Sequence, residues 1–330
     1  MEFLYAADQK LGKIIHLLIP FCVILGILFP SVFRPIAPFT ILLFAFMTFT
    51  NSLGAGFRDL GGVFLRPIPI AVTLLLLHLV MPLVLLFVGG LLFPGEYYLI
   101  AGMVLQFSIP TGVVSLMWVS MGRGNSPLTL SIVLLDTLLA PFLLPLILRL
   151  LLGATVEMDA LGMMGDLVKM VALPALLAML FHRFAGKERA NHLKRSLSPF
   201  AKLDMLLITC VNSSGIAETV RGMNLRLLFI AGIMLAFCIS GFIVGYLTAR
   251  LLRLDFPTTV SVTLNTGIRN ISAGSVIASQ YFPAETLFPV VICTLFMQFT
   301  ASLVIRVLRR TKAGQLEEAR LASMSEDAAR

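Results

Sequence analysis

Long apolar stretches, separated by short polar or basic loops, fill most of the chain up to about residue 310. A helix needs about 20 apolar residues to cross the hydrocarbon core of a bilayer. Stretches of that length begin near Leu11, Pro38, Pro67, Tyr97, Pro127, Leu161, Pro199, Arg226, Phe256 and Pro283. The pattern predicts an all-α polytopic membrane protein, with a domain of ten transmembrane helices in residues 1–310 and a polar tail in residues 311–330.

Composition indicates the same class of protein. Hydrophobic residues make up 58% of the chain and charged residues 13%, and the mean hydropathy is +0.97. Such an apolar composition excludes a soluble globular protein. The net charge of +8 does not indicate nucleic-acid binding, because Lys and Arg lie in short loops between apolar stretches. We expect a lipid bilayer around the chain, no nucleic acid and no obligate protein partner.

The distribution of Lys and Arg predicts the orientation in the membrane. When successive loops are assigned to alternate sides, the N-terminus, the loops after the even-numbered spans and the tail carry most of the basic residues. The opposite side holds only Arg34, Arg149, Arg221 and Arg226. Cytoplasmic loops are enriched in Lys and Arg. We therefore expect a multi-pass protein of the cell inner (plasma) membrane with both termini in the cytoplasm.

Two halves of five spans each, residues 11–152 and 161–310, resemble one another weakly. Phe93-Pro94 opens the fourth span, as Phe256-Pro257 opens the ninth, and similar Leu-rich segments close the fifth and tenth spans. An odd number of spans per half places matching segments on opposite sides of the membrane, which is the property of an inverted repeat. Chance similarity between Leu-rich segments is the alternative.

The fourth and ninth spans each contain a polar segment that interrupts a helix. Pro110 removes a backbone donor, and Gly112 and Gly267 allow the chain to bend. In inverted-repeat transporters, the binding site lies where equivalent helices are broken near the midplane. Two crossing, broken helices would direct half-helix N-termini at one cavity, which suits an anion. An ordinary proline kink is the alternative for Pro110.

These segments and one carboxylate of the fifth span supply the candidate site. We expect substrate binding or coupling to involve Ser108, Pro110, Thr111, Gly112, Ser115, Asp136, Asn265, Thr266, Gly267, Arg269 and Asn270. Arg269 is the main evidence for this hypothesis, because a charge near the middle of a span is costly without a partner, a water-filled cavity or a ligand. Arg pairs with carboxylates through two parallel hydrogen bonds. The expected substrate is therefore a small organic anion, and more narrowly a carboxylate.

The alternative for Arg269 is a structural ion pair, and Asp136 is the expected partner. Asp136 could also carry a proton. His16 and His78 each lie singly in apolar spans, and we interpret them as packed or hydrogen-bonded residues. No constellation for an intramembrane enzyme is present, and no cofactor is expected. A channel or a membrane sensor remains the alternative from another functional class.

Several motifs give the chain a resemblance to the bile acid:sodium symporter family, over about residues 10 to 310. They are Asp59 with Pro67, Met81-Pro82, Pro110, Arg123-Gly124-Asn125, Leu138-Leu139-Ala140-Pro141 and Gly267-x-x-Asn270. The resemblance implies a panel domain of helices 1, 2, 6 and 7 and a core domain of helices 3–5 and 8–10, with helices 4 and 9 crossing. It also implies symport of organic anions with sodium by alternating access.

The chain departs from the sodium-coupled members at the sodium ligands. Asn265 and Arg269 stand where those members have an acidic residue and a Gln, and Val133 replaces a hydroxyl ligand of the fifth span. One hypothesis is that the Arg269 guanidinium occupies the space of a bound sodium ion, so that sodium coupling is altered or lost and protons become the alternative coupling ion. The other is a weak sodium site formed by Ser115, Thr129, Asn265 and Asn270.

Overall fold

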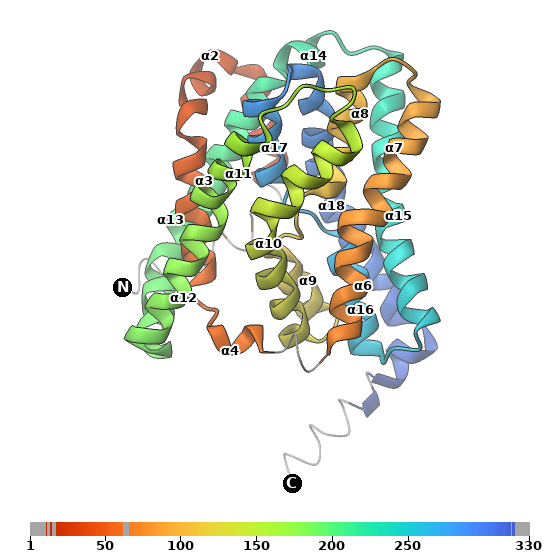
Figure 1. The fold of residues 1–330 in the computed structure, drawn as a ribbon. Helices are drawn as coiled ribbons and strands as arrows, with labels where there is room; N and C mark the ends of the chain where they lie inside the picture. Colours follow the sequence, from red (N-terminus) through yellow and green to blue (C-terminus); the bar gives the residue numbers. More distant parts are fainter. Residues whose placement is uncertain (1–10, 12–13, 15–17, 62–65, 318, 321–330) are drawn as a thin grey trace.

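The computed structural model describes the chain apart from residues 1–10, 12–13, 15–17, 62–65, 318 and 321–330. His16 therefore lies outside the described residues. Every regular element in the described part is a helix (Figure 1). This confirms the predicted all-α class.

The first half of the chain contains α2 (Pro30–Phe33), α3 (Thr40–Ser52), α4 (Phe57–Leu60), α6 (Pro67–Leu75), α7 (Met81–Leu92), α8 (Tyr97–Ser108), α9 (Val114–Met121) and α10 (Ser126–Leu152). The second contains α11 (Ala160–Leu167), α12 (Leu173–Ala185), α13 (Lys187–Gly215), α14 (Ala217–Arg221), α15 (Leu225–Leu251), α16 (Phe256–Gly267), α17 (Ile271–Tyr281) and α18 (Ala284–Arg310). A 3₁₀ segment, η1 (Arg34–Phe39), joins α2 to α3. Two single π-helical turns, η2 (Leu76–Val80) and η3 (Val168–Ala172), join α6 to α7 and α11 to α12.

In the described part, 6 continuous helices are long and apolar enough to cross a membrane. They are Pro30–Ser52, Pro67–Leu92, Ser126–Leu152, Ala160–Ala185, Leu225–Leu251 and Ala284–Arg310. The other predicted spans differ for physical reasons: Leu18–Leu28 is short, α13 has a polar first half, and the fourth and ninth spans are interrupted. The chain is thus a multi-pass membrane protein.

The helices pack in two neighbouring groups that are visible in Figure 1. In one group, α3 packs against α12 and α13. In the other, α15 packs against α16 and α18, and α8 packs against α7 and α18. Helix α10 contacts α11 and η3, which precede α12, and also contacts α8 and α16 of the second group.

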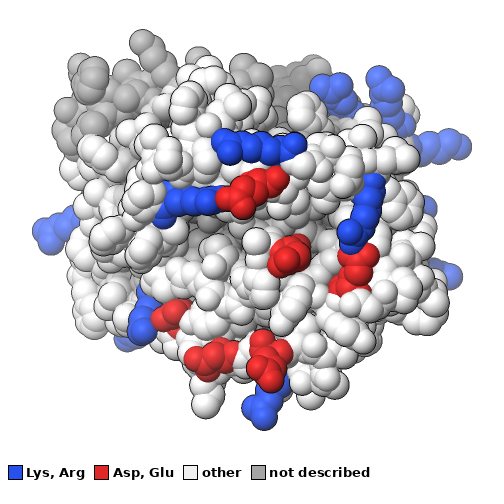
Figure 2. Space-filling model, turned by 90° about the horizontal axis from the view of Figure 1, so that it is seen from above, with Lys and Arg blue, Asp and Glu red and all other residues white. Residues whose placement is uncertain are grey.

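The outer surface changes from apolar sides to charged ends. Large apolar side chains such as Phe87, Phe142 and Phe299 are exposed on the sides. Seen from the end where α14 lies, Asp and Glu side chains stand among Lys and Arg (Figure 2). At this end Arg34 forms an ion pair of 2.9 Å with Glu218. Exposed apolar sides with polar ends are the surface that a bilayer requires.

Candidate functional site

The two predicted interruptions are present. Helix α8 ends at Ser108, and Ile109, the residue before Pro110, adopts an extended conformation with φ −65° and ψ 148°. Proline disfavours the helical conformation in the residue that precedes it. Helix α16 ends at Gly267, where an added Cβ would lie 2.2 Å from the ring of Phe242. Only glycine allows the backbone to lie so close to this ring.

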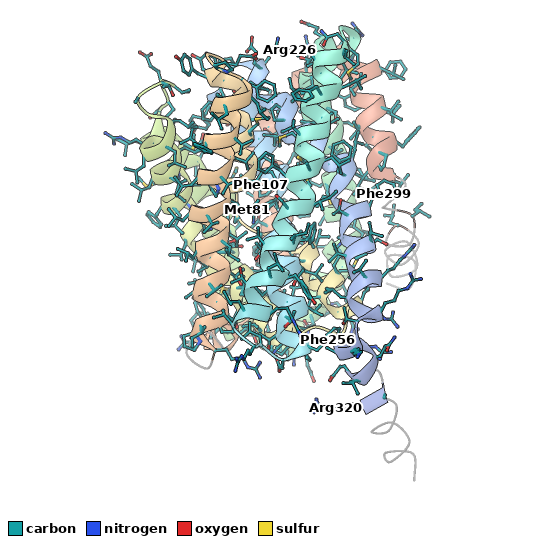
Figure 3. The ribbon with its side chains drawn as sticks, turned by 90° about the vertical axis from the view of Figure 1, so that its right-hand side faces the viewer. Met81, Phe107, Arg226, Phe256, Phe299 and Arg320 are labelled. Carbon is teal, nitrogen blue, oxygen red and sulfur yellow. The ribbon has the colours of Figure 1, made fainter. Side chains whose placement is uncertain are left out.

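The two interrupted segments contact each other through their backbones. The Asn270 N–H donates a 2.9 Å hydrogen bond to the Pro110 carbonyl. A Cβ on Gly112 would lie 3.3 Å from the Arg269 carbonyl oxygen. In Figure 3, Phe107, which directly precedes the first break, lies midway between Arg226 at one end and Phe256 at the other. The crossing is therefore at mid-height in the molecule.

Asn265 organises a buried polar cluster at the crossing. Its Oδ1 accepts hydrogen bonds from Ser115 Oγ at 3.0 Å and from Thr111 Oγ1 at 3.4 Å. Its Nδ2 donates to Thr129 Oγ1 at 3.1 Å and to the Ser261 carbonyl at 2.8 Å. All the hydrogen-bonding capacity of the amide is used within the protein. Side chains of the fourth, fifth and ninth predicted spans are thus held together by neutral groups.

Asn270 does not join that cluster through its side chain. Its Oδ1 accepts a 3.3 Å hydrogen bond from the Ala273 N–H and so caps α17. The structure therefore brings together Ser115, Thr129 and Asn265 of the predicted weak sodium site and directs the Asn270 side-chain oxygen to a helix cap.

Arg269 is 3% exposed and lies over the face of an aromatic ring. Its Cζ is 5.5 Å from the centroid of the Phe107 ring. None of its three guanidinium nitrogens has a hydrogen-bond partner among the residues that the structure describes. The expected ion pair with Asp136 is not formed, which corrects that alternative. Arg269 is thus a buried cation stabilised in part by a cation–π contact.

Asp136 binds other groups. Its Oδ1 lies 2.5 Å from His78 Nε2, and its Oδ2 accepts a 2.7 Å hydrogen bond from the Thr111 N–H. The other ring nitrogen of His78, Nδ1, lies 3.1 Å from the Ser108 carbonyl oxygen. The prediction that His78 is hydrogen-bonded is confirmed, but its pairing with Asp136 was missed. His78 lies on the π-helical turn η2, and no sequence pattern indicated that turn.

A cavity of about 410 Å³ lies where the two helix groups face one another. Its polar or charged lining consists of Thr48, Asn51, Ser52, Asp59, Ser126, Thr137, Lys194 and Asn270. Among the predicted site residues, only Asn270 is part of this wall. Val113, the N-cap of α9, lines the same cavity. The N-termini of α9 and α17 therefore both border it, as expected for the two broken helices.

Lys194 is the cation of this cavity, and sequence reasoning missed it. It forms no hydrogen bond or ion pair with any described residue, and burial lowers the pKa of its ammonium group. The Asp59 carboxylate, which also lines the cavity, accepts a 2.7 Å hydrogen bond from the Gly56 N–H. The predicted span began near Pro199, whereas α13 begins at Lys187 and contains Pro199. This earlier start places Lys194 on a helix and not in a loop.

The half of the molecule that holds α17 is closed by contacts between the two helix groups. Gln280 Nε2 donates to Thr40 Oγ1 at 3.2 Å, and Tyr281 Oη donates to Asp166 Oδ2 at 2.5 Å. Helix α17 also packs against α3 and α13. The cavity thus lies on the side of the crossing away from these contacts, next to α4 and the start of α10.

Comparison with known proteins assigns the family. The profile of the sodium bile acid symporter family matches residues 40–222, more than half of the 330-residue chain. The chain belongs to this family. The family assignment confirms the resemblance that the sequence motifs indicated, and members of the family are membrane transporters. The protein is therefore a transporter of a small molecule and not an enzyme.

Relatives of this symporter-family chain come from bacteria and plants. The uncharacterized protein YbaS of Bacillus subtilis (strain 168) is 40% identical over 294 residues, which cover 89% of this chain and 96% of that protein. The probable sodium/metabolite cotransporter BASS1, chloroplastic, of Arabidopsis thaliana is 28% identical over 89% of this chain and 73% of its own. The uncharacterized sodium-dependent transporter YocS of Bacillus subtilis (strain 168) is 21% identical over 85% and 86%, respectively.

Proposed function

We propose that this symporter-family protein carries a small organic carboxylate across the plasma membrane by alternating access, with sodium coupling that is altered or lost. The observation that carries the substrate class is Lys194, a cation without a partner among the described residues, in the wall of a cavity of about 410 Å³. Binding pockets for small molecules have volumes of about 300–1,000 Å³. The cavity has the size for one small anion, and Lys194 supplies a positive charge in its wall.

The N-termini of α9 and α17 add to the positive electrostatic potential that Lys194 creates in the cavity. Backbone N–H groups at a helix N-terminus carry partial positive charge, which favours a bound anion. Val113 and Asn270 place the starts of α9 and α17 in the lining of the cavity, to which Lys194 of α13 also belongs. A carboxylate in the cavity would contact Lys194 from one helix group and the half-helix termini from the other.

This position supports a mechanism in which two rigid bodies move past one another. In the proposal, α2, α3 and α11–α13 form the panel domain, and α6–α10 and α15–α18 form the core domain. Ten spans in two inverted repeats and cytoplasmic termini complete the proposed topology. Opening the half of the molecule that holds α17 requires breaking the Tyr281–Asp166 and Gln280–Thr40 hydrogen bonds, while the cavity beside Lys194 closes.

Loss of sodium coupling is supported by the chemistry of the crossing. Sodium is a hard cation that needs several oxygen ligands. The Asn265 amide oxygen is already occupied by Ser115 and Thr111 hydroxyl groups, and Arg269 adds a permanent positive charge nearby. The second candidate is a sodium-coupled symporter that uses the weak site of Ser115, Thr129, Asn265 and Asn270. This candidate is favoured by the similarity to a probable sodium/metabolite cotransporter of plants and to the sodium-dependent transporter YocS.

Thermal unfolding of the purified protein with small organic carboxylates and their uncharged amides tests the substrate class. A ligand that binds only the folded state raises the unfolding temperature by mass action. We expect at least one carboxylate to stabilise the wild type, its amide to have no effect, and Lys194→Gln to abolish the shift. Lys187→Gln, an exposed lysine at the start of the same helix, is the matched control and should retain the shift. An equal shift in Lys194→Gln would overturn the assignment.

A further inference from the structure

The hydrogen bonds of His78 determine where its protons lie. The Ser108 carbonyl oxygen can only accept, so at 3.1 Å it requires a proton on His78 Nδ1. His78 Nε2 lies 2.5 Å from Asp136 Oδ1, and this contact also requires a proton, on either the nitrogen or the oxygen. A neutral imidazole beside an ionised carboxylate lacks one of these two protons. The observed geometry therefore corresponds to a pair that has taken up one additional proton.

Loss of that proton would disrupt one of the two contacts. If the remaining ring proton stays on Nδ1, lone pairs of Nε2 and Oδ1 face each other across 2.5 Å. If it moves to Nε2, lone pairs of Nδ1 and the Ser108 oxygen face each other across 3.1 Å. The buried pair excludes most water, because His78 is 6% exposed and Asp136 is 0% exposed. An unpaired acceptor at such a site is costly, so the pair must rearrange.

The pair spans the break between α8 and α9. Ser108, the last residue of α8, contacts the imidazole, and the Thr111 N–H inside the break donates to Asp136 Oδ2 at 2.7 Å. The imidazole itself is carried by the π-helical turn η2. Such turns occur frequently at functional sites. A change in protonation therefore acts directly on the backbone of the crossing.

Arg269 is the remaining charged group of the buried crossing. Helices α6, α7, α9 and α16 contain no titratable side chain, and η2 contains only His78. The other titratable groups described on α4, α8, α10, α11 and η3 are Asp59, Tyr97, Tyr98, Arg149, Asp166 and Lys169, and none of them is hydrogen-bonded to His78 or Asp136. Arg269 interacts electrostatically with Asp136, although no ion pair is formed.

We propose that His78 and Asp136 form a proton-binding site, and that release of the proton transfers Asp136 from His78 to Arg269. In the protonated state, the imidazolium and carboxylate neutralise each other and the guanidinium has no acceptor. In the deprotonated state, neutral His78 no longer needs the carboxylate, which becomes the acceptor for the Arg269 guanidinium. The proton comes from water and returns to water, and only an N–H or O–H bond forms or breaks. The three groups carry a net charge of +1 with the proton and 0 without it.

The use of this proton as the coupling ion rests on the proposed transport function, but proton binding to His78 and Asp136 does not. The site supplies what the altered sodium ligands lack, namely a cation that binds at the crossing and is released again. The Arg269–Asp136 ion pair expected from the sequence then belongs to the deprotonated state. Each cycle of proton binding would change which group holds the α8–α9 break.

Histidine ¹⁵N NMR of the purified, full-length protein tests the site without any substrate. We expect one imidazole with a protonated Nδ1 to gain and lose the proton on Nε2 as the pH is varied, and its signal to be absent from His78→Gln. In Asp136→Asn the amide donates to Nε2, so the ring should stay neutral in the same series of spectra. A wild-type His78 that stays neutral with its proton on Nε2 throughout would overturn the proposal, and this result needs no variant to fold.

Arg269→Gln tests the competition for Asp136. Removing the cation should favour the protonated pair, so a larger fraction of His78 should carry both ring protons at a given pH. Asp204→Asn is the matched control, because Asp204 is a buried carboxylate of α13 with no hydrogen-bond partner among the described residues, and it should leave this fraction unchanged. An unchanged fraction in Arg269→Gln would exclude Arg269 as the competing group. Failure of carboxylates to bind would leave both NMR results intact and would count only against the proposed substrate.

Discussion

At the scale of single residues, two cations that lack an acceptor in the described part of the chain have different surroundings. Arg269 is buried at the crossing, with the Phe107 ring against its guanidinium, whereas Lys194 is half-buried and borders a cavity. Removing a cation from water without an acceptor is costly, so each position indicates a function that compensates for the cost. For Arg269 we infer charge balance with Asp136, and for Lys194 contact with the substrate.

Carboxylate binding should weaken at alkaline pH because Lys194 loses its charge. Burial lowers the pKa of the Lys194 ammonium below the usual value of about 10.4, so it deprotonates earlier than an exposed lysine as the pH rises. Affinity should be constant while Lys194 is protonated and fall as the pH passes its lowered pKa. Lys194→Arg should retain affinity to higher pH, because a guanidinium stays charged. Titration calorimetry across this range checks the prediction, and identical pH profiles for the two proteins would contradict it.

At the scale of elements, the sequence predicted the broken helices but not the details that place the chemistry. The breaks at Pro110 and Gly267 have local causes that the sequence reveals. Pro110 lacks a backbone N–H donor, and Gly267 lacks a side chain. The π-helical turn that carries His78 and the early start of α13 depend on packing with other helices. The pairing of His78 with Asp136 and the position of Lys194 could not be predicted for that reason.

Gly267→Ala should destabilise the crossing. The new Cβ would lie 2.2 Å from the Phe242 ring, which is itself buried, so backbone or ring must shift. Overpacking of this kind costs about 1–3 kcal/mol. Gly90→Ala in α7 is the matched control, because nothing lies within 4 Å of its Cβ position. Thermal unfolding should show a lower transition only for Gly267→Ala. Equal stability of the two variants would contradict the close approach.

At the scale of the whole molecule, the cavity and the closed contacts lie on opposite sides of the crossing. This asymmetry supports the proposed mechanism of alternating access. The all-helical class and the membrane setting followed from hydropathy, because burial in lipid constrains every span in the same way. Ten spans, an inverted repeat and cytoplasmic termini stay predictions.

Tyr281→Phe should favour opening of the closed half. It removes the hydroxyl group that donates to Asp166 and leaves the ring in place. A cysteine at Thr40, which is 1% exposed, would report the opening through its rate of reaction with a maleimide. The native cysteines in the described part are buried, so their background reaction should be slow. We expect faster labelling of Thr40→Cys when Tyr281→Phe is added. An unchanged rate would show that this hydrogen bond does not hold the closed half.

The central claim is that the Arg269 guanidinium takes the place of sodium as the cation of the crossing, where the neutral Asn265 stands in place of an acidic sodium ligand. The most direct measurement is thermal unfolding of the purified protein in sodium chloride against potassium chloride at equal ionic strength. We predict the same unfolding temperature in both salts, and a sodium-specific rise in the double variant Asn265→Glu with Arg269→Gln, which restores the residue types of sodium-coupled members. A sodium-specific rise in the wild type would contradict the claim and establish the weak sodium site instead.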